Sequence, residues 1–416
     1  MKRTTIVGRI SSGLSRVSLV LISLLFLLSA LGAGVFAAEK PKKVYEIRMG
    51  TLAPAGTPWT IAVGLIAPII RDYTGGRIKI IPITSGLMGN DLEVLDKIRR
   101  DQLEGCGCNA AGLFEVAPEL SVLSLPFLFS SYEEVEYVLN HLRPEIDRIL
   151  ESKGFARGAF VDAGFYFFYS RLDPSSLDKI RRQKTGSFWG KFELLTLKAI
   201  GIDPIPLNLA EITADIKGEK FDGTLAPASG VLGVQAYSFF RYFVEQPFYY
   251  TPCAAIFSRK TFDRIESGLR KDPEEFQRLK ADFEHFQRSI SPNDYLRHQG
   301  VTDRSIWQMG QEVFAWLQGQ ELKSPGDLAP LVLNTTRLAE KNWGSLLRAF
   351  EEQTQEGFVR RGMKTVRLSD ADMKYFLELS RKLQDDLAGK LYPRKFLDQI
   401  LQLKKEFNEK ALQEIY

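Results

Sequence analysis

Few side chains in this chain of 416 residues have the types and spacing that catalysis requires. A catalytic centre needs a nucleophile beside a base, a pair of carboxylates, or a cluster of metal ligands. The three histidines, His141, His285 and His298, lie in charged stretches with a helical pattern and have no partner motif. Glu211 and Asp222 have the sequence context of capping and turn residues. The pattern therefore predicts neither an enzyme nor a cofactor site.

The three cysteines, Cys106, Cys108 and Cys253, do not suggest a metal centre either. Cys106 and Cys108 alternate in a predicted strand, so both point to one face, and a disulfide between such close neighbours would be strained. No histidine or third cysteine lies near them in the sequence. We expect buried apolar thiols, and the odd count leaves at least one thiol unpaired.

The N-terminal segment differs from the rest of the chain. Basic residues precede an apolar run over residues 17–31, and the small residues of 35–37 follow. This pattern predicts a secretory signal peptide over residues 1–37 and a periplasmic location, whether or not the signal is cleaved. An uncleaved membrane anchor is the alternative, although the apolar run is short for a membrane span.

The remaining chain has the composition of a globular protein large enough for two lobes, since the whole sequence is 44% hydrophobic and 25% charged. Residues 1–37 contain four basic and no acidic residues, so their removal lowers Lys+Arg from 55 to 51, equal to the 51 Asp+Glu. The mature chain is therefore formally neutral, and we expect no nucleic-acid partner.

Residues 201–223, GIDPIPLNLAEITADIKGEKFDG, are the segment around which the predicted fold is organised. They indicate a strand at 205–207, a helix from Asn208 or Leu209 to Gly218, and a strand entered at Phe221 before a tight turn. A strand, helix and strand of this kind build one lobe of an α/β binding protein. A generic α/β unit without a binding site is the alternative interpretation.

The elements on either side continue this pattern. We expect strands at 44–49, 78–83 and 105–111, helices at 59–73 and from Asp91 to about 100, and charged helices after residue 261. Two longer strands, at 155–169 and 248–257, should cross between the lobes. The loop 50–59 follows a strand end and is a candidate pocket wall, where Trp59 is either a wall residue or a core residue.

The central segment resembles the G-x-x-P-x-P-L…E-x-x-x-A…G…DG signature of the solute receptors of TRAP transporters, the dicarboxylate-receptor or DctP type. Residues 118–120 with 125–129 resemble the P-E-L…L-P-F-L-F run of that family, and residues 177–184 resemble its L-D-D-L-K-G-L-K segment. Residues 362–370 resemble its G-M-x-V…L-S-D segment. The resemblance covers about residues 44–257 and 357–407.

The resemblance implies an α/β, two-lobed periplasmic binding protein of type II-like architecture, with mixed sheets, hinge-crossing strands and C-terminal helices. Lobe I would comprise residues 44–163 and about 252–275. Lobe II with its bracing helices would comprise 164–251 and about 351–416. The segment of about residues 275–350 is longer than the corresponding segment of most family members. We expect it to be a helical insertion. Such a receptor closes over a small organic acid and delivers it to the membrane subunits of the transporter.

The resemblance also implies two arginines and an asparagine that hold the ligand carboxylate. Carried over without gaps, the arginine positions fall on Tyr166 and Gly186, and the asparagine position falls on Ala226. Burying a carboxylate without a paired cation costs several kcal/mol or more. We therefore expect a ligand that is not a simple dicarboxylate. Arg181, Arg182 and Lys184 lie off register and are expected to be surface charges.

The predicted pocket is apolar and aromatic, and suits a hydrophobic or amphiphilic small molecule, or an aromatic acid oriented by hydroxyl groups. The candidate ligand-binding residues are Trp59, Asn109, Phe127, Tyr166, Phe168, Gly186, Leu209, Ala226, Tyr249 and Tyr250. The alternative function is an interaction protein that carries a ligand and docks an envelope partner protein through residues 275–350.

Overall fold

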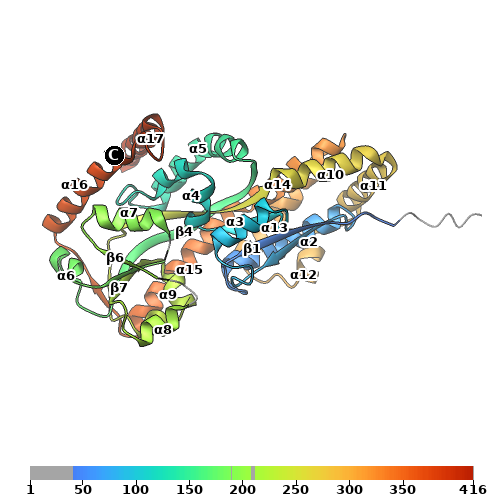
Figure 1. Ribbon diagram of the computed structural model, residues 1–416. Coiled ribbons are helices and arrows are strands. Elements are labelled where there is room, and N and C mark those ends of the chain that lie inside the picture. Colours follow the sequence, from blue (N-terminus) through green and yellow to red (C-terminus); the bar gives the residue numbers. More distant parts are fainter. Residues whose placement is uncertain (1–40, 189, 208–210, 416) are drawn as a thin grey trace, which may run out of the picture. The chain divides into compact units, whose positions relative to one another are not determined.

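The computed structural model describes residues 41–188, 190–207 and 211–415 (Figure 1). The predicted signal peptide and the expected helix start at Asn208 and Leu209 lie outside these described residues. Residues 44–416 form one unit. Among the described helices, none combines the length and apolar character that a membrane span needs.

The described part of this unit is built on a mixed sheet of ten strands. The strands are β1 (Tyr45–Thr51), β2 (Ile78–Ile83), β3 (Gly105–Cys108), β4 (Phe155–Ser170), β5 (Thr185–Ser187), β6 (Pro204–Pro206), β7 (Gly223–Ala226), β8 (Tyr242–Val244), β9 (Tyr249–Ser258) and β10 (Lys364–Val366). Their order is β2-β1-β3-β9-β4-β7-β5-β6, with β8 paired to β4 and β10 paired to β8. The expected α/β fold with mixed sheets and long crossing strands is confirmed.

The two crossing strands are β4, of 16 residues, and β9, of 10 residues. They pair in antiparallel orientation, with register shifts after Arg157 and after Asp162. The second shift includes Gly164, whose φ of +111° is a conformation that residues with a Cβ rarely adopt. The two strands link the two halves of the sheet. The cavity described below lies beside their paired middle segments.

Helices cover both faces of the sheet (Figure 1). The helices are α2 (Pro58–Tyr73), α3 (Asp91–Arg99), α4 (Ala110–Val116), α5 (Tyr132–Ser152), α6 (Leu177–Arg181), α7 (Lys191–Ala199), α8 (Ile212–Lys217), α9 (Ala228–Gly233), α10 (Arg259–Lys271), α11 (Pro273–Ser289), α12 (Pro292–His298), α13 (Arg304–Leu317), α14 (Leu328–Leu338), α15 (Glu340–Arg360), α16 (Asp370–Leu387) and α17 (Arg394–Ile415). Short 3-10 turns lie at Pro118–Ser124, Ala236–Ser238 and Pro325–Asp327. Along β4, alternate side chains enter different cores, because Ala159 and Val161 pack with α2 and α14 while Phe160 packs with α5.

Residues 275–350 form helices that pack onto the sheet half containing β1 and β2. Phe276, Leu279 and Phe283 of α11 are buried in the same core as α2. The fully buried Arg77, just before β2, pairs with Glu275 at 2.7 Å and with Asp282 at 2.6 Å. The exposed large hydrophobic side chains of the described chain all lie outside residues 275–350. The apolar surface of this helical region is therefore used internally.

The cysteines depart from expectation, because the structure joins Cys106 and Cys108 in a disulfide. The prediction of two buried free thiols is wrong. Their Cα atoms lie 5.4 Å apart. That separation is inside the usual disulfide range of about 4.4–6.8 Å and shorter than the roughly 6.6 Å that two steps of a regular strand span. Gly107 between them adds no side chain, and Cys253 is the unpaired thiol that the odd count predicted.

Alkylation with iodoacetamide should therefore modify one cysteine per chain in denaturant without reductant, and all three cysteines of the sequence after reduction. The modified residue in the first case should be Cys253, identified by peptide mass spectrometry. Alkylation of Cys106 and Cys108 without reductant would show that this pair is reduced in the purified protein. A Cys253→Ser variant should take up no label before reduction.

Candidate functional site

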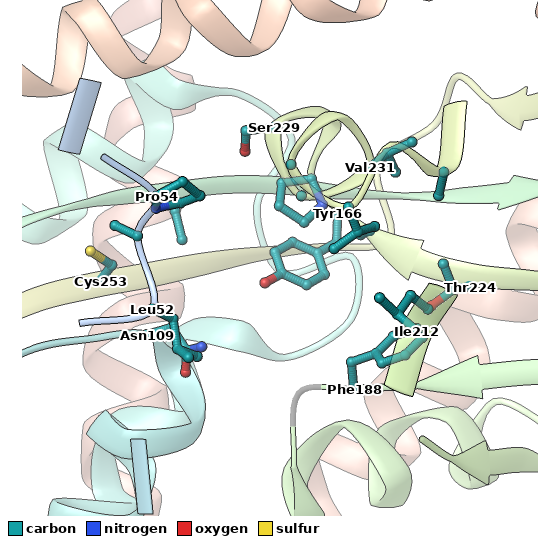
Figure 2. Close-up of a pocket in the computed structure, with 18 of the residues that line it drawn as sticks. Leu52, Pro54, Asn109, Tyr166, Phe188, Ile212, Thr224, Ser229, Val231 and Cys253 are labelled. Carbon is teal, nitrogen blue, oxygen red and sulfur yellow. The ribbon is translucent and has the colours of Figure 1, made fainter. Parts of the chain in front are cut away.

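A cavity of about 210 Å³ lies beside the crossing strands (Figure 2). Its walls include the end of β1 and the loop to Pro54, the start of α2, the end of β3 and the N-cap of α4, the middle of β4, and residues 226–234 around α9. Among the described residues that line it, none has a charged side chain. The wall is built from aliphatic and aromatic groups with a few hydroxyl and amide groups, so it is suited to holding an apolar molecule.

Four of the predicted site residues line this cavity. They are Trp59, Asn109, Tyr166 and Ala226, which come from α2, the α4 N-cap, β4 and β7. These residues are far apart in the sequence, and the strand order brings them together. Leu209 lies outside the described residues. Ligand contact by any of these side chains stays a prediction.

Five other candidates lie away from the wall of this cavity. Phe127 packs against Phe248 and Phe376, with ring centroids 5.3 Å and 5.4 Å away. Phe168 is fully buried in the same core. Both rings therefore fill a core beside this cavity rather than its wall, and ligand contact by either stays a prediction.

Two tyrosines of β9 are likewise used internally. Tyr249 donates its hydroxyl hydrogen to Glu193 at 2.8 Å, and Tyr250 donates to Asp162 at 2.7 Å. Both hydroxyls are buried with their carboxylate acceptors, and burial raises the pKa of each tyrosine well above its usual value. Both lie outside this cavity wall, and ligand contact by either stays a prediction.

Tyr166 occupies the position to which the resemblance assigns the first arginine. Figure 2 shows its ring extending into the space between the labelled wall residues. The ring pairs with that of Tyr249 across the strands, with centroids 4.8 Å apart. Burial raises the pKa of Tyr166 well above its usual value, so the hydroxyl stays neutral. This position supplies a neutral aromatic surface in place of a cation.

Gly186, at the position assigned to the second arginine, lies in β5 and is buried outside the cavity wall. A Cβ at this position would collide with the side chain of Leu207 and lie 3.2 Å from Phe221. Phe221 in turn packs edge-on against Phe188, which does line the cavity. The space that a longer side chain would need is therefore filled by apolar groups from neighbouring segments.

The nearby basic residues do not replace the missing arginines. Arg181, Arg182 and Lys184 are all absent from the described cavity wall. Arg181 lies over the ring of Tyr375 at 5.0 Å and donates to the Ile200 carbonyl. Arg182 and Lys184 differ from Arg181 in having exposed side chains.

Asn109 is the amide group of the cavity wall. Its Oδ1 accepts from the Ala111 backbone N–H at 2.8 Å and so caps α4. The Nδ2 group makes no hydrogen bond within the described part of the chain, and Figure 2 shows it on the cavity side. Asn109 is therefore the clearest donor that the wall offers to a ligand.

Asp91 supports Asn109 from behind. Asp91 is the first residue of α3, whose cap is Asn90, accepting from the Glu93 N–H at 3.1 Å. Asp91 is buried and accepts from the Asn109 N–H at 3.2 Å. Burial raises the pKa of Asp91 to about 6. The carboxyl group thereby fixes the backbone from which the Asn109 side chain projects.

Glu351 of α15 is a buried carboxyl group behind the opposite wall. Both of its oxygens lie 3.2 Å from the backbone N–H of Ser229, a cavity residue. Burial raises the pKa of Glu351 to about 7, although hydrogen bonds from Ser229 and Ala228 oppose this shift. The first N–H groups of α9 are thus satisfied by a protein carboxyl group.

Sequence reasoning missed much of the cavity wall, including most of the part contributed by α9 and the loops around it. The missed residues include Ala163, Phe188, Ile212, Val231, Phe240 and Cys253. A usable signal was the small-residue run at 226–230, Ala-Pro-Ala-Ser-Gly, which begins three residues after Gly223 of the Asp-Gly turn. Such residues let a backbone approach a ligand closely, whereas the prediction concentrated on large aromatic side chains.

The family model described as bacterial extracellular solute-binding protein, family 7 (DctP), matches residues 49–279. This match covers more than half of the chain, so the chain belongs to that family. The family and the structural neighbours are solute-binding receptors rather than enzymes.

Relatives of known sequence are distant. An uncharacterised protein of Haemophilus influenzae is 24% identical over 284 residues, which is 66% of this chain and 85% of that protein. The C4-dicarboxylate-binding protein DctB of Bacillus subtilis is 29% identical over 84 residues, 20% of this chain and 24% of that protein. The second of these matches covers too little of either chain to transfer a ligand.

Solved structures share the fold. The sugar acid binding protein DctPAm of Advenella mimigardefordensis, in complex with galactonate, gives a TM-score of 0.67 at 18% identity, covering 88% of this chain and 99% of that one. The Bordetella pertussis receptor DctP7, which binds pyroglutamic acid, gives 0.65 at 14% identity, covering 87% and 100%. These likenesses establish the two-lobed fold of TRAP solute-binding proteins.

Proposed function

We propose that this chain is the periplasmic receptor of a TRAP-type transporter and that it captures a hydrophobic or amphiphilic organic molecule. The receptor role rests on the family match, and the transporter class on the TRAP receptors that share the fold. The membrane subunits of the transporter would be the partners, and closure of the lobes on the ligand would create the form that they recognise.

The observation that carries the ligand class is the cavity wall without a charged side chain among its described residues. A carboxylate buried there would lack a paired cation, which costs several kcal/mol. Tyr166 and the filled space at Gly186 remove the two positions at which the family resemblance expects cations. The buried Glu351 adds an acidic group behind Ser229, which further disfavours an anion in the cavity.

Titration calorimetry with ligand-free protein tests the proposal. Succinate, malate, galactonate and glucuronate should bind no more tightly than millimolar, whereas apolar or aromatic molecules with one polar group should include micromolar ligands. Micromolar binding of any of the four acids would contradict the proposed ligand class. The receptor role would survive that result, because it rests on the family.

Asn109→Asp should weaken binding of such a ligand about tenfold, the effect of losing roughly one hydrogen bond. The substitution retains an oxygen that can cap α4 but replaces the free Nδ2 donor with an acceptor. Asn90→Asp is the matched control, because Asn90 also caps a helix through its side-chain oxygen, which accepts from the Glu93 N–H, and it lies outside the cavity wall. Calorimetry on both variants checks the prediction, and equal affinities would show that Asn109 makes no ligand contact.

The alternative function, docking of an envelope partner through residues 275–350, gains no support from a specific observation. The apolar side chains of that region pack within the fold, and Arg77 ties α11 to β2.

A further inference from the structure

A second cavity of about 80 Å³ lies between the sheet and the helices α2, α14 and α15. Small and branched apolar side chains form most of its wall, among them Val63 and Ala67 of α2 and Ala159 of β4. Three hydroxyl groups in the described wall are already used, and the Trp343 indole N–H is a buried polar group there without a hydrogen-bond partner among the described residues. Thr51 Oγ1 accepts from the Ala53 backbone N–H. Thr60 donates to the Pro54 and Thr57 carbonyls, and Thr336 donates to the Leu333 carbonyl.

The two cavities adjoin. Five wall residues belong to both of them: Thr51, Ala53, Trp59, Gly107 and Cys253. Four of these five are small, so among the described residues Trp59 is the only large side chain in the shared wall. Its ring is half-buried and meets Phe350 edge-on at 6.3 Å. A rotation of this one side chain would change the width of the passage between the cavities.

The first cavity, of about 210 Å³, is called the main cavity below, and its wall includes the amide of Asn109. The second cavity is surrounded by core side chains. An apolar void in a protein core stays dry and accepts apolar guests. At about 80 Å³ it is smaller than the roughly 150 Å³ apolar cavity that holds benzene in another protein. It therefore suits the end of a chain or a small ring rather than a whole ligand.

We propose that the second cavity binds the apolar end of the transported molecule. The polar end remains in the main cavity beside Asn109, and an alkyl chain or apolar ring passes Trp59 into the space beneath α2. The ligand class is thereby an elongated amphiphile with one polar end. This inference rests on the proposed function, since it needs a hydrophobic ligand in the main cavity.

The test uses straight-chain primary alcohols of increasing length, from butanol to decanol, as probes in calorimetry with the full-length mature protein. For the wild type, each added methylene should improve affinity about fourfold until the second cavity is full. Ala67→Leu places extra atoms in that cavity. The affinity of this variant for the alcohols should therefore stop rising at a shorter chain length than in the wild type. The longest alcohol that the wild type binds should bind the variant at least tenfold more weakly. The shortest alcohol should bind as in the wild type.

Gly64→Leu is the matched control. It adds a larger side chain to the same helix, at an exposed position with no heavy atom within 4 Å of the added Cβ. Its chain-length profile should follow that of the wild type. Equal profiles for Ala67→Leu and the wild type would overturn the inference and leave the proposed ligand class standing. Failure of every alcohol to bind the wild type, together with micromolar binding of a sugar acid, would overturn both.

A crystal structure of the wild type with the tightest alcohol gives an answer that depends on no variant. Electron density for the chain beyond Trp59, between α2 and β4, would support the inference. Density for the whole chain within the main cavity would contradict it.

Discussion

Lowering the pH from 7.5 to 5 should stabilise the ligand-free protein through two buried carboxyl groups. Burial raises the pKa of Glu351 from 4.5 to about 7 and that of Asp91 from 3.8 to about 6. In this range the folded protein binds protons that the unfolded chain does not. The stability is therefore present at pH 5 and is lost as the pH rises through the folded pKa values. We expect about 2 kcal/mol from Glu351 and about 1 kcal/mol from Asp91.

Urea unfolding at both pH values measures this difference. Glu351→Gln replaces the buried acid by a neutral group of the same shape, so it should remove about two thirds of the pH difference, and Asp91→Asn should remove most of the rest. Glu352→Gln, at the exposed neighbouring position, is the control and should leave the difference unchanged. A Glu351→Gln variant with the full wild-type pH difference would show that Glu351 has an ordinary pKa in the folded protein.

Ala163→Phe should abolish ligand binding, with a loss of at least about 100-fold, equivalent to roughly 2.7 kcal/mol. Ala163 lies in the middle of β4, is partly exposed, and lines the main cavity. An aromatic ring at this position would extend into the space that the ligand needs. Phenylalanine suits a strand, and empty space is available for it, so we expect a change of less than about 1 kcal/mol in the free energy of unfolding.

Calorimetry with a ligand identified for the wild type checks this loss of binding, and urea unfolding checks the fold. Ala163→Ser, which adds a single hydroxyl group, is the control and should bind within about threefold of the wild type. Wild-type affinity in Ala163→Phe would mean that the ligand lies elsewhere than in the cavity of Figure 2.

The architecture was predictable because its signals are local. The apolar alternation of residues 78–83 gave the bounds of β2, and the two long aromatic and aliphatic runs gave the crossing strands β4 and β9. Helix α8 ends at Gly218 as expected, because the helix stops where its apolar periodicity ends. Such features depend on residues that are neighbours in the sequence.

The cavity wall was only partly predictable because its decisive contacts are distant in sequence. Glu351 reaches Ser229 across 122 positions, and Phe221, two residues before β7, closes the space at Gly186. Strand parity also could not separate Tyr166 from Phe168, because residues two apart point to the same face. Both rings belong to one core, and the sheet geometry decides that Tyr166 also lines the cavity and that Phe168 does not.

The most direct test of the ligand class is native mass spectrometry of the protein purified from its own cell envelope, followed by extraction and identification of the bound molecule. We expect an apolar or amphiphilic compound, in keeping with a described cavity wall that has no charged side chain. A small organic acid, such as a dicarboxylate or a sugar acid, would contradict this conclusion and would mean that the cavity neutralises a carboxylate by another route.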